Sequence, residues 1–378
     1  MIRGGTNTAD VAWYVIEIPT VKVTSPDGNE VWYVGETNNI TWTYMASASN
    51  VDIELSSNGG SSYIGTKIAT GVTGSSGSYP WYIPEKLGTT DIMGTTMRVK
   101  ITDTTDTTTN WDKSNANFEI RGKINLDIPN GGELWYINDT TRNIQWDVNG
   151  DIEYVDIYRA VDGDQPSPTW VKIGNDINAY NNCSQGTYGA TNCTWTWNPI
   201  PDLPYNTMKI MVESDDDAAR TWTQVTDKSA AVFEIRPNVT VVKPAASDNW
   251  LVGRTHTIQW TATGTVTSMN VFYNPAGTGY VVPPGITNPI TGYTGGSCPV
   301  NKFCYDWLID PTTEQATAKI RLDKSDNAQV TDESSDFNLI ASLDLDNPAT
   351  TTTLRAYDGS NAVPIDWSHP EQPAMSNI

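Results

Sequence analysis

The chain has 378 residues and a net charge of −21, with 44 acidic against 23 basic residues. No basic patch exists to displace counterions from phosphates, and no apolar run approaches the roughly 18 residues of a membrane span, so nucleic-acid binding and membrane insertion are excluded. Tryptophan (15) and tyrosine (17) far outnumber phenylalanine (5), and short alternating runs such as 97–102 and 154–160 are separated by turn residues, which predicts an all-β fold.

Three segments of closely similar sequence recur along the chain, at residues 21–42, 124–146 and 239–260. In each segment a proline lies six residues before a tryptophan, and a second tryptophan follows ten or eleven residues later. A period of about one hundred residues is too long for a solenoid unit and suits one small domain. The predicted boundaries are 1–20 for an N-terminal strand extension, 21–122, 123–237 and 238–342 for repeats 1, 2 and 3, and 343–378 for a partial fourth repeat.

Each repeat contains the same landmarks in the same order. The opening proline is followed by the first tryptophan, a strand ending Ile-x-Trp, a third tryptophan before a proline-broken segment, and a closing strand at Phe118, Phe233 or Phe337. About seven short strands in about a hundred residues is the size of an immunoglobulin-like β-sandwich, so we expect three such domains in tandem. The repeated tryptophans are predicted to pack in the cores: Trp32, Trp42, Trp81, Trp135, Trp146, Trp197, Trp250, Trp260 and Trp307.

Four cysteines form two local pairs, Cys183 with Cys193 and Cys298 with Cys304. Both pairs fall just before the third tryptophan of repeats 2 and 3, whereas repeat 1 has no cysteine there. Pairs that are local, equivalent and dispensable indicate disulfide bonds, and therefore an oxidising, extracellular compartment. Free core thiols and a metal site are the alternatives, and zinc is disfavoured because neither of the two histidines adjoins a cysteine pair.

Three motifs of the repeat carry a resemblance to a known family. They are Pro-x-Gly-Gly-x-x-Trp (129–135), the Ile-x-Trp strand, and the closing Ser-x-x-x-Phe-x-Ile (114–120 and 229–235). Together they resemble the β-sandwich domain of the yeast cell-wall-synthesis and Ser/Thr-rich GPI-anchored surface protein family, and similar domains occur in tandem in bacterial and archaeal surface proteins. Repeat 3 departs from the motifs, with Ala245-Ala246-Ser247 replacing the glycine turn and Ser334 one residue closer to the closing phenylalanine. The resemblance implies a surface location with a wall or adhesion role, and it brings no catalytic residues.

Linkers between the repeats are nearly absent. In residues 118–129 and 233–244, a closing strand runs into the next opening strand with only two or three residues between them. A flexible chain of domains needs Gly/Ser spacers, so we expect a semi-rigid rod. Arg121 and Arg236 are predicted to lie at equivalent joints of this rod, within reach of acidic loops.

Both ends of the chain match parts of a repeat. Leu354 takes the place of the first tryptophan and Trp367 ends a segment where the Ile-x-Trp strand belongs, so residues 343–378 match the opening third of a repeat. Residues 12–26 resemble a closing strand that leads into an opening strand. Two explanations stay open: a window on a longer periodic polypeptide, or a subunit whose last domain is completed by strands of the next copy. Because isolated strand pairs expose unpaired backbone, we expect the partner to be the chain itself, with folding back onto the same chain as the alternative.

Acidic residues gather in the loop before each closing strand. Oxygen-rich clusters suit Ca²⁺, and Asp215, Asp216 and Asp217 are the predicted calcium ligands. The alternative is a solvated acidic loop partly balanced by Arg121 or Arg236, because no loop has the spacing of an EF-hand. No other cofactor is expected. The acidic residues of the three loops are Asp103, Asp106 and Asp112; Glu213, Asp215, Asp216, Asp217 and Asp227; and Asp323, Asp326, Asp332 and Glu333.

Two further residue sets are candidates for surface functions. Trp111 and Trp222 lie within the acidic loops, where an exposed indole would stack on a sugar, or alternatively pack at a domain joint. Five asparagines begin Asn-x-Ser/Thr sequons and are candidate glycosylation sites: Asn39, Asn138, Asn182, Asn192 and Asn238.

Nothing in the sequence favours an enzyme. A nucleophile needs a base beside it, and the two histidines, His256 in a repeated core strand and His369 in the tail, give no Ser-His or Cys-His arrangement. No segment breaks the repeat symmetry as an active site would. We therefore predict a non-enzymatic extracellular structural protein, a subunit or segment of a surface filament assembled end to end by β-strand addition. The alternative is a cell-surface adhesin or carbohydrate-binding module carried on a rod of immunoglobulin-like domains.

Overall fold

The computed structural model describes residues 21–44, 50–179, 181–186, 189–215, 223–275, 277–311, 315–340, 355–357 and 362–364. Apart from one turn of 3-10 helix, η1 (Gly74–Ser76), the regular elements of these residues are β-strands, which confirms the all-β prediction. The same residues contain no helix that is long and apolar enough to cross a membrane. The predicted N-terminal extension, and the predicted fourth repeat apart from 355–357 and 362–364, lie outside the described residues.

The chain divides into two compact units. Unit 1 comprises Met1–Gly131, Asn143–Trp195 and Lys209–Val232, and unit 2 comprises Gly132–Arg142, Thr196–Met208 and Phe233–Ile378. Repeat 1 therefore belongs to unit 1 and repeat 3 to unit 2, while the strands of repeat 2 are divided between the two units.

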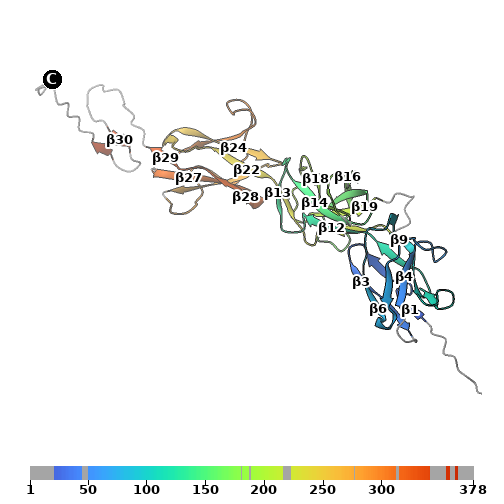
Figure 1. Cartoon of the computed structure of the whole chain (residues 1–378). Helices are drawn as coiled ribbons and strands as arrows, with labels where there is room; N and C mark the ends of the chain where they lie inside the picture. The colour runs from blue at the N-terminus through green and yellow to red at the C-terminus, as the bar shows by residue number, and fades with distance from the viewer. Residues whose placement is uncertain are drawn as a thin grey trace, which may run out of the picture. The chain divides into compact units, whose positions relative to one another are not determined.

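Repeat 1 is a sandwich of two sheets, drawn in blue to cyan in Figure 1. One sheet has the strand order β1-β3-β6. The other has the order β2-β11-β9-β4-β5, with β10 also paired to β9, and β7 pairs separately with β8. The strands are β1 (Val21–Ser25), β2 (Val31–Tyr33), β3 (Thr37–Tyr44), β4 (Asn50–Ser56), β5 (Ala69–Thr73), β6 (Ser78–Tyr82), β7 (Lys86–Leu87), β8 (Thr90–Asp91), β9 (Gly94–Asp103), β10 (Trp111–Lys113) and β11 (Phe118–Arg121).

The opening segment of repeat 1 contributes to both sheets. β1 pairs antiparallel with β3, the chain turns at Pro26 after a cis peptide bond, and β2 then pairs in parallel with the closing strand β11. Proline has no N–H to donate to a ladder, so the pairing of β1 ends there. The turn places Trp32 opposite Ile120 of the closing strand.

The other strands of unit 1 belong to repeat 2 and form two four-stranded sheets, β12-β14-β18-β17 and β16-β15-β19-β20. Along β14, buried and accessible side chains alternate, because one face of the sheet packs on the core. The strands are β12 (Lys123–Ile128), β14 (Asn143–Asn149), β15 (Tyr154–Ala160), β16 (Val171–Asn178), β17 (Ser184–Gly186), β18 (Gly189–Thr196), β19 (Lys209–Ser214) and β20 (Thr226–Lys228).

Unit 2 contains the parallel pair β13-β21 of repeat 2 and the two sheets of repeat 3, β22-β24-β26 and β23-β29-β27-β25, with β28 paired to β27. The opening segment again splits: β22 pairs antiparallel with β24, and β23 pairs in parallel with the closing strand β29. A separate two-stranded sheet, β30-β31, falls in the predicted fourth repeat. The strands are β13 (Leu134–Tyr136), β21 (Glu234–Arg236), β22 (Asn238–Lys243), β23 (Asn249–Leu251), β24 (Thr255–Thr263), β25 (Met269–Pro275), β26 (Phe303–Leu308), β27 (Gln315–Lys324), β28 (Asn327–Glu333), β29 (Phe337–Ile340), β30 (Arg355–Tyr357) and β31 (Ala362–Pro364).

Nearly the same aromatic cluster occurs three times. The first tryptophan of each repeat lies edge-on to the third tryptophan, and their ring centroids are 6.2, 6.3 and 6.4 Å apart in repeats 1, 2 and 3. The ring centroid of the first tryptophan also lies 5.1, 5.0 and 5.1 Å from that of the closing phenylalanine. All nine predicted core tryptophans are buried. Sheets that are antiparallel except for the pairing of opening and closing strands, with the opening segment shared between them, form an immunoglobulin-like arrangement. The protein is a tandem of these domains.

The turn after the opening proline explains the departure of repeat 3. A Cβ on Gly28 or Gly131 would lie 2.5 Å from the Cβ of Ala116 or Ala231, so the first two repeats require glycine at this close approach. Repeat 3 has Ala246 at this position. It also lacks one residue between Ser334 and the closing phenylalanine, in the segment that supplies the facing alanine of the other repeats. Both departures of repeat 3 therefore affect the same contact, which joins the opening turn to the segment before the closing phenylalanine.

Candidate functional site at the joints between repeats

The first joint, where β11 runs into β12, is held by Glu119 within unit 1. One oxygen of this carboxylate accepts a hydrogen bond from Thr223 N (3.2 Å) and the other accepts one from Arg121 Nη2 (2.7 Å). Burial alone would raise the pKa of Glu119, but the hydrogen bonds from Arg121 and Thr223 outweigh it, and the pKa lies below its ordinary value. Lys123 adds an exposed ion pair with Glu36 (3.0 Å). The end of repeat 1 is thereby tied to the acidic-loop segment of repeat 2.

The second joint, where β21 runs into β22 in unit 2, uses the same two positions of the closing strand. Arg236 donates from Nε to Glu234 Oε1 (2.8 Å) and from Nη2 to Glu234 Oε2. It also donates from Nη1 to the carbonyl oxygen of Gln329 (3.1 Å) and from Nη2 to its side-chain oxygen (3.0 Å). Because Gln329 lies in β28 of repeat 3, Arg236 connects the closing strand of one repeat with the hairpin of the next. Arg121 and Arg236 thus occupy equivalent joints.

A close backbone approach also shapes each joint. Gly264 follows β24 with φ of +77°, and a Cβ there would lie 2.5 Å from Ile137 Cδ1. Gly150 takes the equivalent position in the first joint, where a Cβ would lie 2.6 Å from Met93 Sδ. Both glycines come four residues after the second tryptophan of their repeat. Glycine at that spacing is a sequence signal for the joint that was not among the predicted features.

The first acidic loop shows what its carboxylates do. Asp106 accepts hydrogen bonds from Thr109 and Thr108, which lower its pKa to about 2. Burial would raise the pKa of Asp103, but hydrogen bonds outweigh burial and lower it. The donors to Asp103 are Thr105, Tyr44 and Asn110. These carboxylates are engaged by donors of their own repeat.

One aspartate of each acidic loop binds the opening strand of its own repeat. The accepting oxygens belong to Asp112, Asp227 and Asp332, and the donors are the backbone N–H groups of Val23 (2.9 Å), Leu126 (2.7 Å) and Val241 (2.7 Å). Each donor adjoins the point at which the register of the opening strand shifts. Such a bulge disrupts the ladder locally, and the carboxylate supplies an acceptor beside it. These three acids therefore hold the sandwich together.

Calcium binding remains a prediction. Asp216 and Asp217 lie outside the described residues, and Asp215 is the last described residue before that gap. Within the described part of the chain, no three His, Cys, Asp or Glu side chains are grouped so as to hold a metal ion.

Of the two tryptophans predicted to stack on a sugar, only Trp111 lies within the described residues. Trp222 lies outside the described residues. Trp111 has 43% of its surface exposed, and Lys100 Nζ lies 5.3 Å from its ring centroid and 5.0 Å from that of Tyr63. Lys100 also approaches Glu54 (3.4 Å). Trp111 is thus part of an accessible aromatic and charged face of repeat 1.

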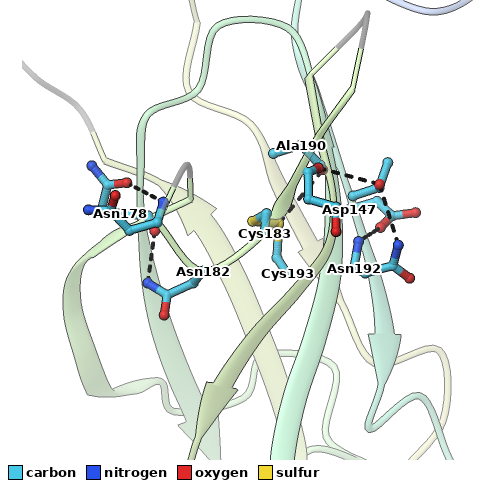
Figure 2. The surroundings of a disulfide bond; sticks show 10 residues. Asp147, Asn178, Asn182, Cys183, Ala190, Asn192 and Cys193 are labelled. Atoms are coloured by element: carbon cyan, nitrogen blue, oxygen red, sulfur yellow. Dashed lines mark hydrogen bonds between the residues drawn. A yellow bond between two sulfur atoms is a disulfide. The ribbon is translucent and has the colours of Figure 1, made fainter.

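Both cysteine pairs are bonded, Cys183 to Cys193 and Cys298 to Cys304. Figure 2 shows the first bond with two sequon asparagines, Asn182 and Asn192, to either side of it. The backbone is tied on both sides, because Thr194 N donates to Asn182 O (3.0 Å) and Asn192 N donates to Asp147 Oδ1 (2.7 Å). The bond therefore joins β18 to the segment that precedes β17.

All five sequon asparagines, Asn39, Asn138, Asn182, Asn192 and Asn238, are exposed. Their positions are compatible with attached glycans, and glycosylation itself remains a prediction.

The chain shows distant likenesses to solved structures. No family model matches the chain, and no curated protein matches it. The chain is similar to Drosophila OTK extracellular domains 3–5 (9% identity, covering 85% of this chain and 97% of that chain, TM-score 0.27) and to the N-terminal four Ig domains of Dscam1 isoform 4.44 (10%, 86% and 75%, TM-score 0.27). It is also similar to the fibronectin(III)-like modules of Clostridium thermocellum CbhA (13%, 58% and 94%, TM-score 0.18). The fold assignment rests on the strand topology, and the resemblance to the yeast surface-protein family stays a prediction.

Proposed function

We propose that this protein is a non-catalytic structural protein of the cell exterior, in which immunoglobulin-like domains serve as a stiff spacer. The observation that carries the proposal is the joint contact made twice. At each joint a Glu-x-Arg pair of the closing strand reaches the loop or hairpin of the following repeat. A chain of independent domains has no need of such contacts. The two disulfide bonds support an oxidising compartment outside the cytosol.

We further propose that copies assemble end to end by β-strand addition. Residues 343–378 match the opening of a repeat, and among the described residues β30 and β31 pair only with each other. A two-stranded sheet on its own is marginally stable in water, whereas pairing with a further strand satisfies its free backbone groups. The strands of a second copy would supply that pairing and extend the chain of domains into a filament.

Electron microscopy of the purified full-length chain tests the assembly. We expect filaments from the unaltered chain and none after deletion of residues 343–378 or after Ala356→Pro, because proline removes a backbone donor from β30. Ala356→Ser keeps the N–H and is the matched control, expected to form filaments. Thermal unfolding of repeats 1 to 3 is expected to be the same in all variants. Dispersed single particles from the unaltered chain, or filaments that survive Ala356→Pro, would contradict the proposal.

The second candidate is an adhesin or carbohydrate-binding module, favoured by the exposed Trp111, whose ring and that of Tyr63 both lie near the Lys100 ammonium. In that case the domains would carry a ligand site on the face of repeat 1, and Trp111→Ala would abolish binding of the chain to glycans.

A further inference from the structure

The second joint contains a hollow of about 520 Å³ that lies wholly within unit 2. Its walls are the segment 204–206 on one side and the β27–β28 hairpin, residues 326–329, on the other, and the end of the closing strand, 234–236, completes it. Ligand pockets have volumes of roughly 300–1,000 Å³ and occur preferentially between domains. The volume of the hollow falls within this range, and the hollow lies between two repeats.

The hollow breaks the symmetry of the repeats. Tyr205 lies three residues before Met208, which bridges to the closing phenylalanine, and the equivalent residue of repeat 1 is Gly94, three residues before Met97. The segment before the closing strand also differs in length between the repeats. It runs from Val212 to Ser229 in repeat 2 and from Leu322 to Ser334 in repeat 3, where it is five residues shorter. The hairpin at the second joint is therefore shorter than the loop at the first. A purely structural joint requires neither the aromatic side chain nor the additional space.

The charged groups around the hollow are paired with one another. Arg236 is bonded to Glu234, and Asp326 forms an ion pair with Lys324. An added anion would meet two carboxylates, and an added cation would meet two basic groups. The lining therefore favours a ligand without net charge.

The remaining groups are an exposed aromatic ring and neutral amides. Tyr205 has 44% of its surface exposed. Among the described residues, the Tyr205 hydroxyl and the Asn206 side-chain amide make no hydrogen bond. Asn327 and Gln329 also line the hollow, and within the same part of the chain their side-chain NH₂ groups donate to no other group. A pyranose presents a C–H face that packs on an aromatic ring and hydroxyls that both donate and accept. We propose that the hollow binds a neutral saccharide, stacked on Tyr205 and hydrogen-bonded by the amides. This site is independent of filament assembly.

Binding of the full-length chain to an immobilised panel of neutral and acidic oligosaccharides, followed by titration with the best-bound soluble oligosaccharide, tests this site. We expect binding to neutral members of the panel. Tyr205→Ala should weaken it at least tenfold, whereas Tyr205→Phe, which keeps the ring, should retain most of it. Tyr82→Ala is the matched control, because Tyr82 in repeat 1 is also 44% exposed. Unchanged thermal unfolding of Tyr205→Ala would show that the joint is intact.

Several outcomes overturn the inference. They are no binding to the panel, binding confined to acidic members, and a Tyr205→Ala variant that binds as well as the control. Loss of binding in Trp111→Ala with retention in Tyr205→Ala would also overturn it, and would favour the face of repeat 1 as the glycan site. Filament formation by the Tyr205→Ala variant separates failure of this site from failure of the structural proposal.

Discussion

His256 lies parallel to the first tryptophan of repeat 3, with its ring centroid 5.0 Å from that of Trp250. Its Nε2 accepts a hydrogen bond from Leu251 N (2.9 Å). Burial lowers the pKa of His256 below its ordinary value of 6.5, although the carbonyl oxygen of Leu251, 3.1 Å from Nε2, acts in the opposite direction because it would accept a hydrogen bond from the protonated ring. Repeats 1 and 2 have Asn38 and Arg142 at this position, two residues before the Ile-x-Trp motif, and neither changes charge near neutral pH.

Repeat 3 is therefore expected to lose stability selectively on mild acidification. Because the folded state depresses the pKa of His256, the contribution of the neutral ring is fully present above pH 6.5 and is lost as the pH falls through the folded-state value. Hydrogen exchange of β24 and β26, measured from about pH 7 down to about pH 5 and corrected for intrinsic rates, should report faster opening in the unaltered chain. His256→Asn, which copies repeat 1, should remove most of this change. A parallel decline in both proteins would contradict the assignment.

In each sandwich, a buried serine just before the closing strand forms hydrogen bonds with backbone groups of other segments. In repeat 2, Ser229 Oγ accepts a hydrogen bond from Ile210 N (3.0 Å) and donates one to Pro129 O (2.7 Å). The second bond links the segment before the closing strand to the opening turn. Repeat 1 makes the same two bonds through Ser114. In repeat 3, Ser334 Oγ still accepts from Ile320 N (2.9 Å) but donates to its neighbour Ser335.

Ser229→Ala should destabilise its repeat more than Ser334→Ala does. The first change leaves two buried groups, Ile210 N–H and Pro129 C=O, without their partner and is expected to cost about 1–3 kcal/mol, whereas the second removes only one long-range bond and should cost about 1 kcal/mol less. Free energies of opening from native-state hydrogen exchange of β19 and β27 provide the measurement. Residues 123–131 should also exchange faster in Ser229→Ala. Equal losses in the two variants would show that the bond to the proline carbonyl contributes nothing.

The elements that could be foreseen from sequence are those fixed by local pattern. The alternation of apolar residues predicted the strands, and the threefold spacing of tryptophans predicted the nine buried indoles. The cysteine pairs were predicted because they are local and lie at equivalent sites in two repeats. The contact between Gly28 and Ala116 could not be foreseen, because it joins residues almost ninety positions apart. For the same reason, Asp112 was grouped with candidate calcium ligands although its carboxylate binds Val23 N. A count of acidic residues does not show which backbone donors face them.

Across the molecule, the joints were only partly predictable. Arg121 and Arg236 were assigned to equivalent joints from their spacing, but their surroundings depend on how an adjoining loop folds. The sequence analysis did not predict the hollow beside Tyr205. The signal was present in the sequence, as a tyrosine where repeat 1 has Gly94 and as the shorter segment before Ser334.

Gly264→Ala should loosen the second joint while leaving the sandwich cores folded. A Cβ at Gly264 would overlap Ile137 Cδ1, and the positive φ adds strain that any L-residue would meet. Gly277→Ala is the matched control, because Gly277 has the same φ of +77° with nothing within 4 Å of the added atom. Hydrogen exchange of residues 234–241 is expected to rise severalfold in Gly264→Ala only. Equal exchange in the two variants would show that strain alone, and no contact at the joint, governs this position.

The parallel pairing of opening and closing strands determines how a domain responds to tension. Force applied along the polypeptide enters a domain through its opening segment and leaves through its closing strand. In repeat 1 the opening segment consists of β1 and β2, and β2 is joined in register to the closing strand β11 from Val31–Glu119 to Tyr33–Arg121. Pulling the two in opposite directions loads the bonds of this ladder in shear, so they must rupture together rather than unzip one after another. The same arrangement recurs in β13–β21 and β23–β29. Each domain is therefore expected to resist tension along the chain until this ladder ruptures.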